Sequence, residues 1–265
     1  MDKILFIKNK IFDESLAKDN VFIKKRLMPW HKYFYKTMFV SQKDKEKLLK
    51  QGKSKYNIFD NKLEANLNLY LKLNKEKLIN KDFSLISNDC WGAYVYTYLD
   101  IRYSSPFIWL YLSSSDFMKL AKDFKKYMEC ELKFIDSDMS FPVGMLGDIK
   151  LNFNHYKTED EARSCFEKRK ERINYNNLYF RMVSENEEEI TSFKEIPHKN
   201  KVMFFNKEKY FKAPLDKNII LMQSTPEYLS FGQYAQLQSY KYFDIIEWLN
   251  SGNVVLTNID KNTGN

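Results

Sequence analysis

The sequence is poor in the residues that break or cross-link a chain. Its 265 residues include only 7 Gly, 6 Pro and 3 Cys. So little Gly and Pro excludes collagen-like and linker-like sequence, and three distant cysteines without a CxxC pair indicate neither a zinc site nor a disulfide framework. No apolar run approaches the roughly 18 residues of a membrane span, and no cleavable signal peptide is recognisable. We therefore expect a cytoplasmic protein with reduced thiols, and peripheral attachment to the inner face of the membrane is the alternative.

Arginine is also scarce, and the positive charge is confined to one end of the chain. The sequence has 37 Lys and 6 Arg, and its net charge is +8. Residues 1–80 hold 19 basic and 9 acidic side chains, whereas residues 81–265 hold 24 and 26. Arg is the favoured base-reading side chain, so specific DNA binding is not expected. The basic segment either faces anionic phosphates or a membrane surface, or reflects a genome rich in A and T codons.

From residue 81 onward, short apolar segments alternate with helical patterns. This alternation predicts an α/β fold in three layers, with a largely parallel sheet, a second smaller α/β part and a mostly helical N-terminal extension. We expect the extension over residues 1–80 and the α/β domain over residues 81–258, with two subdomains if it divides near 140–200. The expected strands are Phe83–Ser87, Phe107–Leu112, Leu132–Ile135, Leu178–Val183, 201–205, 218–222 and Val254–Thr257.

Helix-capping signals place the expected helices between these strands. Ser113 with Asp116, and Thr158 with Glu161, have the spacing of N-terminal caps. The expected helices are Ala93–Leu99, a segment from Ser113 to about Glu129, a segment from Thr158 to about Ile173, and Ser239–Asn250. Pro142–Tyr156 is expected to be extended.

Cys90 is the first candidate for chemistry. It follows a predicted buried strand and begins a helix, where free backbone N–H groups stabilise negative charge. A thiol in that place is expected to have a lowered pKa and to be a better nucleophile. The amides of Trp91 and Gly92 would hold an oxyanion. A small buried side chain in a tight turn is the alternative.

His155 is the candidate base for such a thiol. In a regular strand it shares one face with Ile149, Leu151 and Phe153, and it lies at the strand's C-terminal end, where ligand sites of open α/β sheets are found. A core histidine bonded to a carbonyl is the alternative. Asp148 and Asp89 are the candidates for an orienting carboxylate, although Asp148 faces the other side of a regular strand.

Four segments resemble a known family. They are FSLISNDCWGAYVY, SSPFIWLYLSSSDFMKL, FPVGMLGDIKLNFNHYKTEDEA and RKERINYNNLYFRM, and they are similar to the bacterial "domain of unknown function 1919" family over roughly residues 80–250. Members are often linked to exopolysaccharide or capsule synthesis. A distantly similar group of capsule acetyltransferases uses a cysteine–histidine arrangement and binds coenzyme A.

The resemblance implies a two-part α/β fold and a set of site positions. Members often carry a second histidine at the position of Asn152, so a base at that position would be missing here. The positions that match the family pattern are Asn88, Cys90, Trp91 and Gly92 in the turn, Asp148, His155 and Tyr156 in the second motif, and Arg172, Asn174 and Asn177 without an assigned role.

These features lead to one main hypothesis and three alternatives. The main hypothesis is an acyltransferase or thiol hydrolase of surface polysaccharide synthesis, in which Cys90 attacks a coenzyme A thioester and His155 takes the thiol proton. The acyl group then passes to a sugar hydroxyl, and no metal is expected. The alternatives are a non-catalytic sugar- or partner-binding protein of capsule assembly, a glycosyltransferase with a metal on Asp136 and Asp138, and a nucleic-acid-binding module on the basic extension.

Overall fold

The computed structural model describes residues 55–223 and 229–257, with side chains from residue 63 onward. The chain divides into two compact units, Met1–Ala65 and Asn66–Asn265. Helix α5 (Lys55–Asn74) runs through the division. It confirms a helix in the last third of the expected extension, whereas residues 1–54 lie outside the described residues. The domain boundary after residue 80 stays a prediction.

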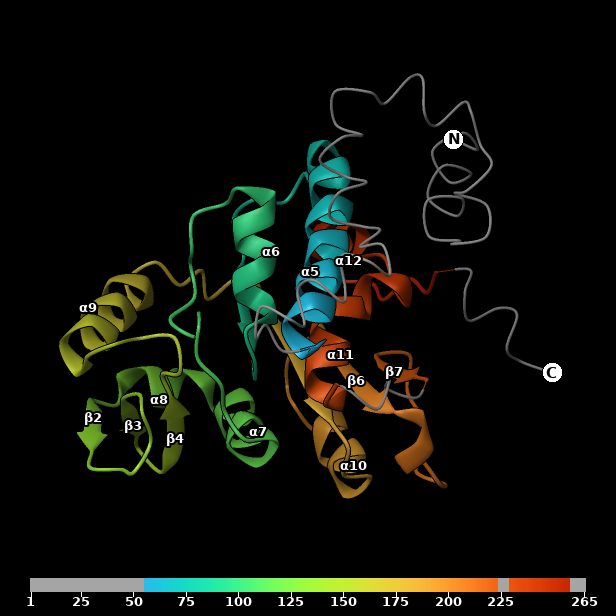
Figure 1. Cartoon of the computed structure of the whole chain (residues 1–265). Helices are drawn as coiled ribbons and strands as arrows, with labels where there is room; N and C mark the ends of the chain where they lie inside the picture. The colour runs from blue at the N-terminus through green and yellow to red at the C-terminus, as the bar shows by residue number, and fades with distance from the viewer. Residues whose placement is uncertain (1–54, 224–228, 258–265) are drawn as a thin grey trace, which may run out of the picture. The chain divides into compact units, whose positions relative to one another are not determined.

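A four-stranded parallel sheet forms the centre of the second unit (Figure 1). Its strands lie in the order β1 (Ser84–Ser87), β5 (Leu178–Ser184), β6 (Lys201–Asn206) and β7 (Ile219–Met222). All three pairings are parallel, which confirms the predicted α/β class. Nearly every strand residue is buried, because helices cover both faces of the sheet.

One face of this sheet is covered by α6 (Trp91–Leu99), α11 (Phe231–Gln238) and α12 (Ile245–Ser251). Tyr179 of β5 packs against Trp248 of α12, with ring centroids 5.0 Å apart. Odd-numbered side chains of β5 therefore point to this layer.

The opposite face is covered by α7 (Ser114–Lys122) and α10 (Glu188–Lys194). Phe180, an even-numbered residue of β5, contacts Phe117 of α7 and belongs to a large apolar cluster. The sheet thus lies between two helical layers, as the sequence predicts.

A small antiparallel sheet follows α8 (Phe124–Glu129). Its strands are β2 (Leu132–Ile135), β3 (Val143–Leu146) and β4 (Ile149–Asn152), and α9 (Glu159–Lys170) comes after them. The turn between β3 and β4 uses Gly147 at φ +62°, a conformation that favours glycine. The short 3₁₀ helices are η1 (Lys75–Lys77), η2 (Lys207–Lys209) and η3 (Ser239–Lys241).

Both predicted caps are confirmed. The Ser113 hydroxyl accepts a hydrogen bond from the Asp116 amide, and the Thr158 hydroxyl accepts one from the Glu161 amide. Each satisfies a backbone donor that the helix leaves unpaired. The helix after Ser113 breaks at Asp123, however, and continues as α8.

Three sequence predictions about elements are wrong. Phe107–Leu112 forms only one bridge, between Tyr111 and Asn152, because Trp109 has a left-handed φ of +61° that no strand accommodates. Val254–Thr257 is likewise not a strand and forms one bridge, between Phe243 and Leu256. Pro142–Tyr156 is a hairpin rather than one extended segment.

The C-terminal helical region also differs from the prediction. Ser239–Asn250 is split into η3 and α12, and Asp244 caps the second piece through the amides of Ile246 and Glu247. The preceding helix, α11, was not predicted. Within residues 55–223 and 229–257, no helix combines the length and apolar character needed to cross a bilayer.

Candidate functional site

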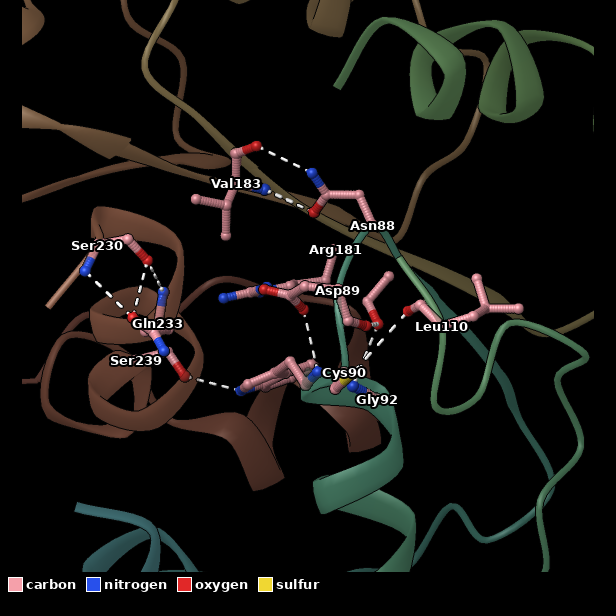
Figure 2. Close-up of polar contacts among 12 residues, drawn as sticks. Asn88, Asp89, Cys90, Gly92, Leu110, Arg181, Val183, Ser230, Gln233 and Ser239 are labelled. Carbon is pink, nitrogen blue, oxygen red and sulfur yellow. Dashed lines mark hydrogen bonds and ion pairs between the residues drawn. The ribbon is translucent and has the colours of Figure 1, made fainter. Parts of the chain in front are cut away.

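The turn Asn88–Cys90 connects β1 to α6 at the carboxyl edge of the parallel sheet, and Trp91 and Gly92 are the first residues of the helix (Figure 2). Cys90 is the residue that precedes the helix, with φ −75° and ψ 3°. The predicted placement, after a buried strand and at the start of a helix, is therefore confirmed.

The Cys90 thiol does not have the predicted electrostatics. The residue is 7% exposed, and its Sγ lies 4.0 Å from the carbonyl oxygen of Leu110. Burial, and secondly the charge of Asp89, raise the pKa of Cys90 to about 12. The expectation of a lowered pKa is wrong, because desolvation of the thiolate outweighs the field of one helix terminus.

The amides expected to hold an oxyanion already have acceptors. The Trp91 amide donates to Asp89 Oδ1 at 3.0 Å, and the Gly92 amide donates to Ser87 Oγ at 3.1 Å. The helix terminus is thus neutralised by a carboxylate of the same turn. An approaching oxyanion would meet that carboxylate and be repelled by it.

Asn88 joins the turn to the neighbouring strand. Its side-chain amide donates to the Val183 carbonyl and accepts from the Val183 amide, both at 3.0 Å. This pair of bonds continues the β1–β5 ladder by one residue. Figure 2 shows that Asn88 points to β5, away from the turn's interior.

Asp89 forms an ion pair with Arg181 of β5, a residue that is fully buried. The guanidinium carbon of Arg181 lies 5.2 Å from the Trp91 ring and 5.1 Å from the Phe204 ring. Burial lowers the pKa of Arg181, and the Asp89 charge offsets part of that. Within the described residues, Nε and Nη2 of Arg181 have no hydrogen-bond partner. Asp89 therefore compensates a buried cation, which is a structural role.

His155 and Asp148 lie beyond opposite ends of β4. The strand ends at Asn152, so His155 is not on its apolar face as predicted but exposed in the following turn, with its ring 5.2 Å from that of Trp109. Asp148 is exposed, pairs with Lys119 at 2.8 Å and accepts a hydrogen bond from the Tyr127 hydroxyl. These bonds lower the pKa of Asp148 to about 2. The carboxylate does not orient the imidazole.

The structure brings other predicted residues together around Trp109. The Tyr156 hydroxyl donates to the Ile108 carbonyl at 2.7 Å and accepts from Arg169. Arg169 lies with its guanidinium carbon 5.0 Å from the Tyr103 ring. We call the half-exposed and exposed rings on this side of the molecule the Trp109 surface. It consists of Tyr94, Tyr98, Tyr103, Trp109 and His155.

The rings of the Trp109 surface contact one another. Trp109 lies edge-on to Tyr94 with centroids 5.3 Å apart, and Tyr94 stacks on Tyr98 at 5.7 Å. The indole N–H of Trp109 donates to the Tyr103 hydroxyl at 3.4 Å. Trp109 holds its position despite a φ of +61°, which for a bulky side chain costs on the order of 1–3 kcal/mol.

Arg169 borders these rings, and both it and Arg102 lie near Arg172. Burial lowers the pKa of Arg172, and the neighbouring guanidiniums of Arg102 and Arg169 lower it further. Glu171 opposes this effect only in part. We call Arg102, Arg169 and Arg172 the arginine cluster. Positive charges close together repel one another, so the cluster favours an anion.

Asn174 and Asn177 have structural contacts at the opposite edge of the sheet. The side-chain amide of Asn174 donates a hydrogen bond to the Asp82 carboxylate. The backbone N–H of Asn174 donates to the Ser84 hydroxyl at 2.8 Å. Asn177 donates to the Asp82 carbonyl at 2.7 Å. Both tie the chain before β5 to the chain before β1, and neither joins the turn of Cys90. Asn152 is 7% exposed and donates to the Tyr111 carbonyl.

The expected coenzyme A and metal sites can be compared with the residues present. Binding of coenzyme A near Cys90 would require a cation for its phosphates. Arg181 is fully buried and already paired with Asp89, and the Asp89 carboxylate would repel the phosphates. These residues do not fit coenzyme A.

Asp136 and Asp138, the residues expected to bind a metal in a glycosyltransferase, are exposed after β2. Within residues 63–223 and 229–257, no three His, Cys, Asp or Glu side chains form a metal-binding group.

Sequence reasoning did not identify Trp109, Tyr103 and Arg102 as site residues. They stand in the segment DIRYSSPFIW, which has neither strand nor helix periodicity. The mixture of aromatic and basic residues outside a regular element was the available signal. Functional residues are disproportionately found in loops.

Comparison with known proteins adds two findings. The family model described as domain of unknown function (DUF1919) matches residues 59–250. An uncharacterized protein of Haemophilus influenzae (strain ATCC 51907 / DSM 11121 / KW20 / Rd) is 31% identical over 181 residues, which cover 66% of this chain and 88% of that protein.

Proposed function

We propose that this chain, which belongs to the DUF1919 family, binds an anionic saccharide of surface polysaccharide synthesis on the Trp109 surface. The observation that carries the proposal is the arginine cluster beside half-exposed aromatic rings. The link to surface polysaccharides comes from the family resemblance and is part of the proposal.

Charge is the first support. Arg102 and Arg169 both lower the pKa of Arg172, and Glu171 is the acidic residue that opposes them there. Guanidinium groups bind carboxylates and phosphates through paired N–H donors. An acidic or phosphorylated sugar would relieve the repulsion among the three groups.

The aromatic rings are the second support. A sugar ring has an apolar face of C–H groups, and the faces of Tyr and Trp rings attract such partial positive charge. The strained φ of Trp109 is the third support, since strain of this kind concentrates at ligand sites.

The binding proposal is tested by titrating the protein with glucuronate, glucose 1-phosphate and glucose while recording tryptophan fluorescence. We expect the two acidic ligands to change the emission and neutral glucose to bind more weakly. Arg172→Gln should weaken binding of the acidic ligands about tenfold. The matched control is Lys133→Gln, which removes one positive charge from an exposed site outside the surface. Equal binding of all three ligands, or an equal loss in the control, contradicts the proposal.

Group transfer to a sugar hydroxyl is the second candidate, and His155 is the observation that favours it. Desolvation lowers the pKa of His155, which favours the neutral imidazole that can accept a proton. In this reaction the sugar hydroxyl would attack the carbonyl of an acyl thioester, and His155 would take the hydroxyl proton and pass it to the thiolate that leaves. Because His155 belongs to the Trp109 surface, we expect His155→Gln to weaken saccharide binding no more than severalfold and to abolish acyl transfer at saturating saccharide. Cys90→Ala should retain transfer, because a thiol with a pKa near 12 is not a nucleophile at neutral pH. Loss of transfer in Cys90→Ala with saccharide binding intact would restore the thiol mechanism.

A further inference from the structure

A cavity of about 440 Å³ opens at the amino edge of the parallel sheet. Leu178, the first residue of β5, and Asn200, which precedes β6, form its floor, and residues near the start of α8 form a wall. Its volume is in the range of small-molecule sites. It shares no lining residue with the Trp109 surface.

The cavity wall is strongly basic. Four lysines line it, namely Lys122, Lys125, Lys126 and Lys199, against one acidic residue, Asp123. Lys122 is paired with Glu195 at 2.7 Å, and the ammonium of Lys126 lies 5.6 Å from the Tyr127 ring centroid. In the part of the chain that the structure describes, Lys125 and Lys199 form no ion pair. The positive charge is therefore not balanced within the cavity.

His198 also lines the cavity and has an unsatisfied nitrogen. Its ring stacks on Phe180 with centroids 4.1 Å apart, and its buried Nε2 has no hydrogen-bond partner within the described residues. Burial lowers the pKa of His198, which favours the neutral imidazole, a ring with one unprotonated nitrogen. Such a group accepts a hydrogen bond from a hydroxyl. Tyr175, 41% exposed, adds a ring at the same site.

We infer that this cavity binds a small phosphate-bearing ligand of the size of a nucleoside diphosphate. Lysine ammonium groups bind phosphate oxygens as point charges. The exposed Tyr175 ring, with the imidazole of His198 in the same lining, suits a base or sugar face. The inference goes beyond the proposed saccharide site, because it concerns other residues at another edge of the sheet.

The experiment is isothermal titration of the full chain with pyrophosphate and with uridine diphosphate at two salt concentrations. The test variant is a double variant that carries both Lys125→Gln and Lys199→Gln. Both positions are exposed, and their replacement breaks no ion pair in the described part of the chain. The matched control is Lys150→Gln with Lys217→Gln, also exposed, which removes the same charge elsewhere. We expect the wild type to bind at least one ligand, with affinity reduced about tenfold in the test variant and unchanged in the control.

Three results would overturn the inference. They are absence of binding by the wild type at millimolar ligand, an equal loss in test and control variants, and binding restricted to anionic vesicles or RNA. Arg172→Gln separates the two proposals, since it should weaken saccharide binding and leave uridine diphosphate binding unchanged. If saccharide binding fails while the lysine pair still controls diphosphate affinity, only the proposed function is lost.

Discussion

Cys90 lies at the position that the sequence predicts, but the pKa of its thiol is raised rather than lowered. Its position at the start of α6 is set by local sequence, and the structure confirms it. Its thiol pKa is set by burial under Leu110 and by the Asp89 carboxylate, which no spacing rule reports. The carboxylate itself is held by Arg181, ninety-two positions later in the chain. The location was therefore predictable and the reactivity was not.

This difference predicts the order of cysteine alkylation. Cys130 and Cys165 are half-buried, so iodoacetamide should modify them in the native protein near pH 8. Cys90 should remain unmodified up to at least pH 9, because a pKa of about 12 leaves almost no thiolate. Peptide mapping by mass spectrometry measures this, and unfolding in urea should expose Cys90 as a control. Native labelling of Cys90 at pH 8 would contradict the structure.

The Asp89–Arg181 pair gives a second prediction at the residue scale. Asp89→Asn leaves a fully buried guanidinium without its counter-charge, and we expect a loss of about 3 kcal/mol in the free energy of unfolding. Urea denaturation measures it. Adding Arg181→Met to Asp89→Asn should recover most of the loss, since both charges are then removed.

A comparison variant is available on the surface. Asp148→Asn breaks the exposed pair with Lys119 and should change stability far less than Asp89→Asn does. If the two single variants were equally destabilised, burial would not be what makes the Asp89 pair important.

At the scale of elements, the segment Phe107–Leu112 departs most from its sequence pattern. An apolar run of this length is typical of a buried strand, and four of its side chains are indeed buried. The left-handed residue Trp109 nevertheless turns the chain, so its ring reaches the surface while Ile108 and Leu110 on either side stay inside. A periodicity rule finds burial here but cannot find the turn.

The strain at Trp109 can be measured with two variants that remove the same ring. Trp109→Gly and Trp109→Ala lose identical aromatic contacts, but only glycine adopts a φ of +61° without a steric penalty. We expect the glycine variant to be more stable than the alanine variant by about 1 kcal/mol in urea denaturation. Equal stability, or a more stable alanine variant, would show that the backbone is not strained.

Elements defined by local signals were predicted well, and those defined by distant contacts were not. The caps at Ser113 and Thr158, and the strands β1, β2, β5 and β6, follow from sequence within a few residues. Helix α11 carries a capping box from Ser230 to Gln233 that could have revealed it. The contacts of His155 with Trp109 and of Tyr156 with Ile108 depend on how the hairpin packs, and this information is not local.

At the scale of the whole molecule, the charge excess belongs to residues that precede α5. Residues 1–54 carry 14 basic and 6 acidic side chains, so residues 55–265 have equal numbers of both signs. The family match begins at residue 59, after this segment. The basic segment and the α/β unit can therefore be tested separately.

Removal of residues 1–54 gives the prediction at this scale. We expect the shortened chain to retain its urea unfolding midpoint and to lose salt-dependent binding to vesicles that contain anionic lipid. Vesicle sedimentation at low and moderate salt measures the binding. Undiminished vesicle binding by residues 55–265 would assign membrane attraction to the α/β unit instead.

The pairing of β1 with β5 also bears on the route by which the chain folds. Met182 lies opposite Met203 and Met203 opposite Ile219, whereas Ser84 lies opposite Leu178. Seven helices and strands, from α6 to α9, lie in the chain between β1 and β5. Contacts between such distant residues form slowly, so we expect β5, β6 and β7 to associate first and β1 to dock last. In that order of events, Asp89 would form its ion pair with Arg181 only after the transition state of folding. Loss of Asp89 should accordingly accelerate unfolding and leave the refolding rate nearly unchanged.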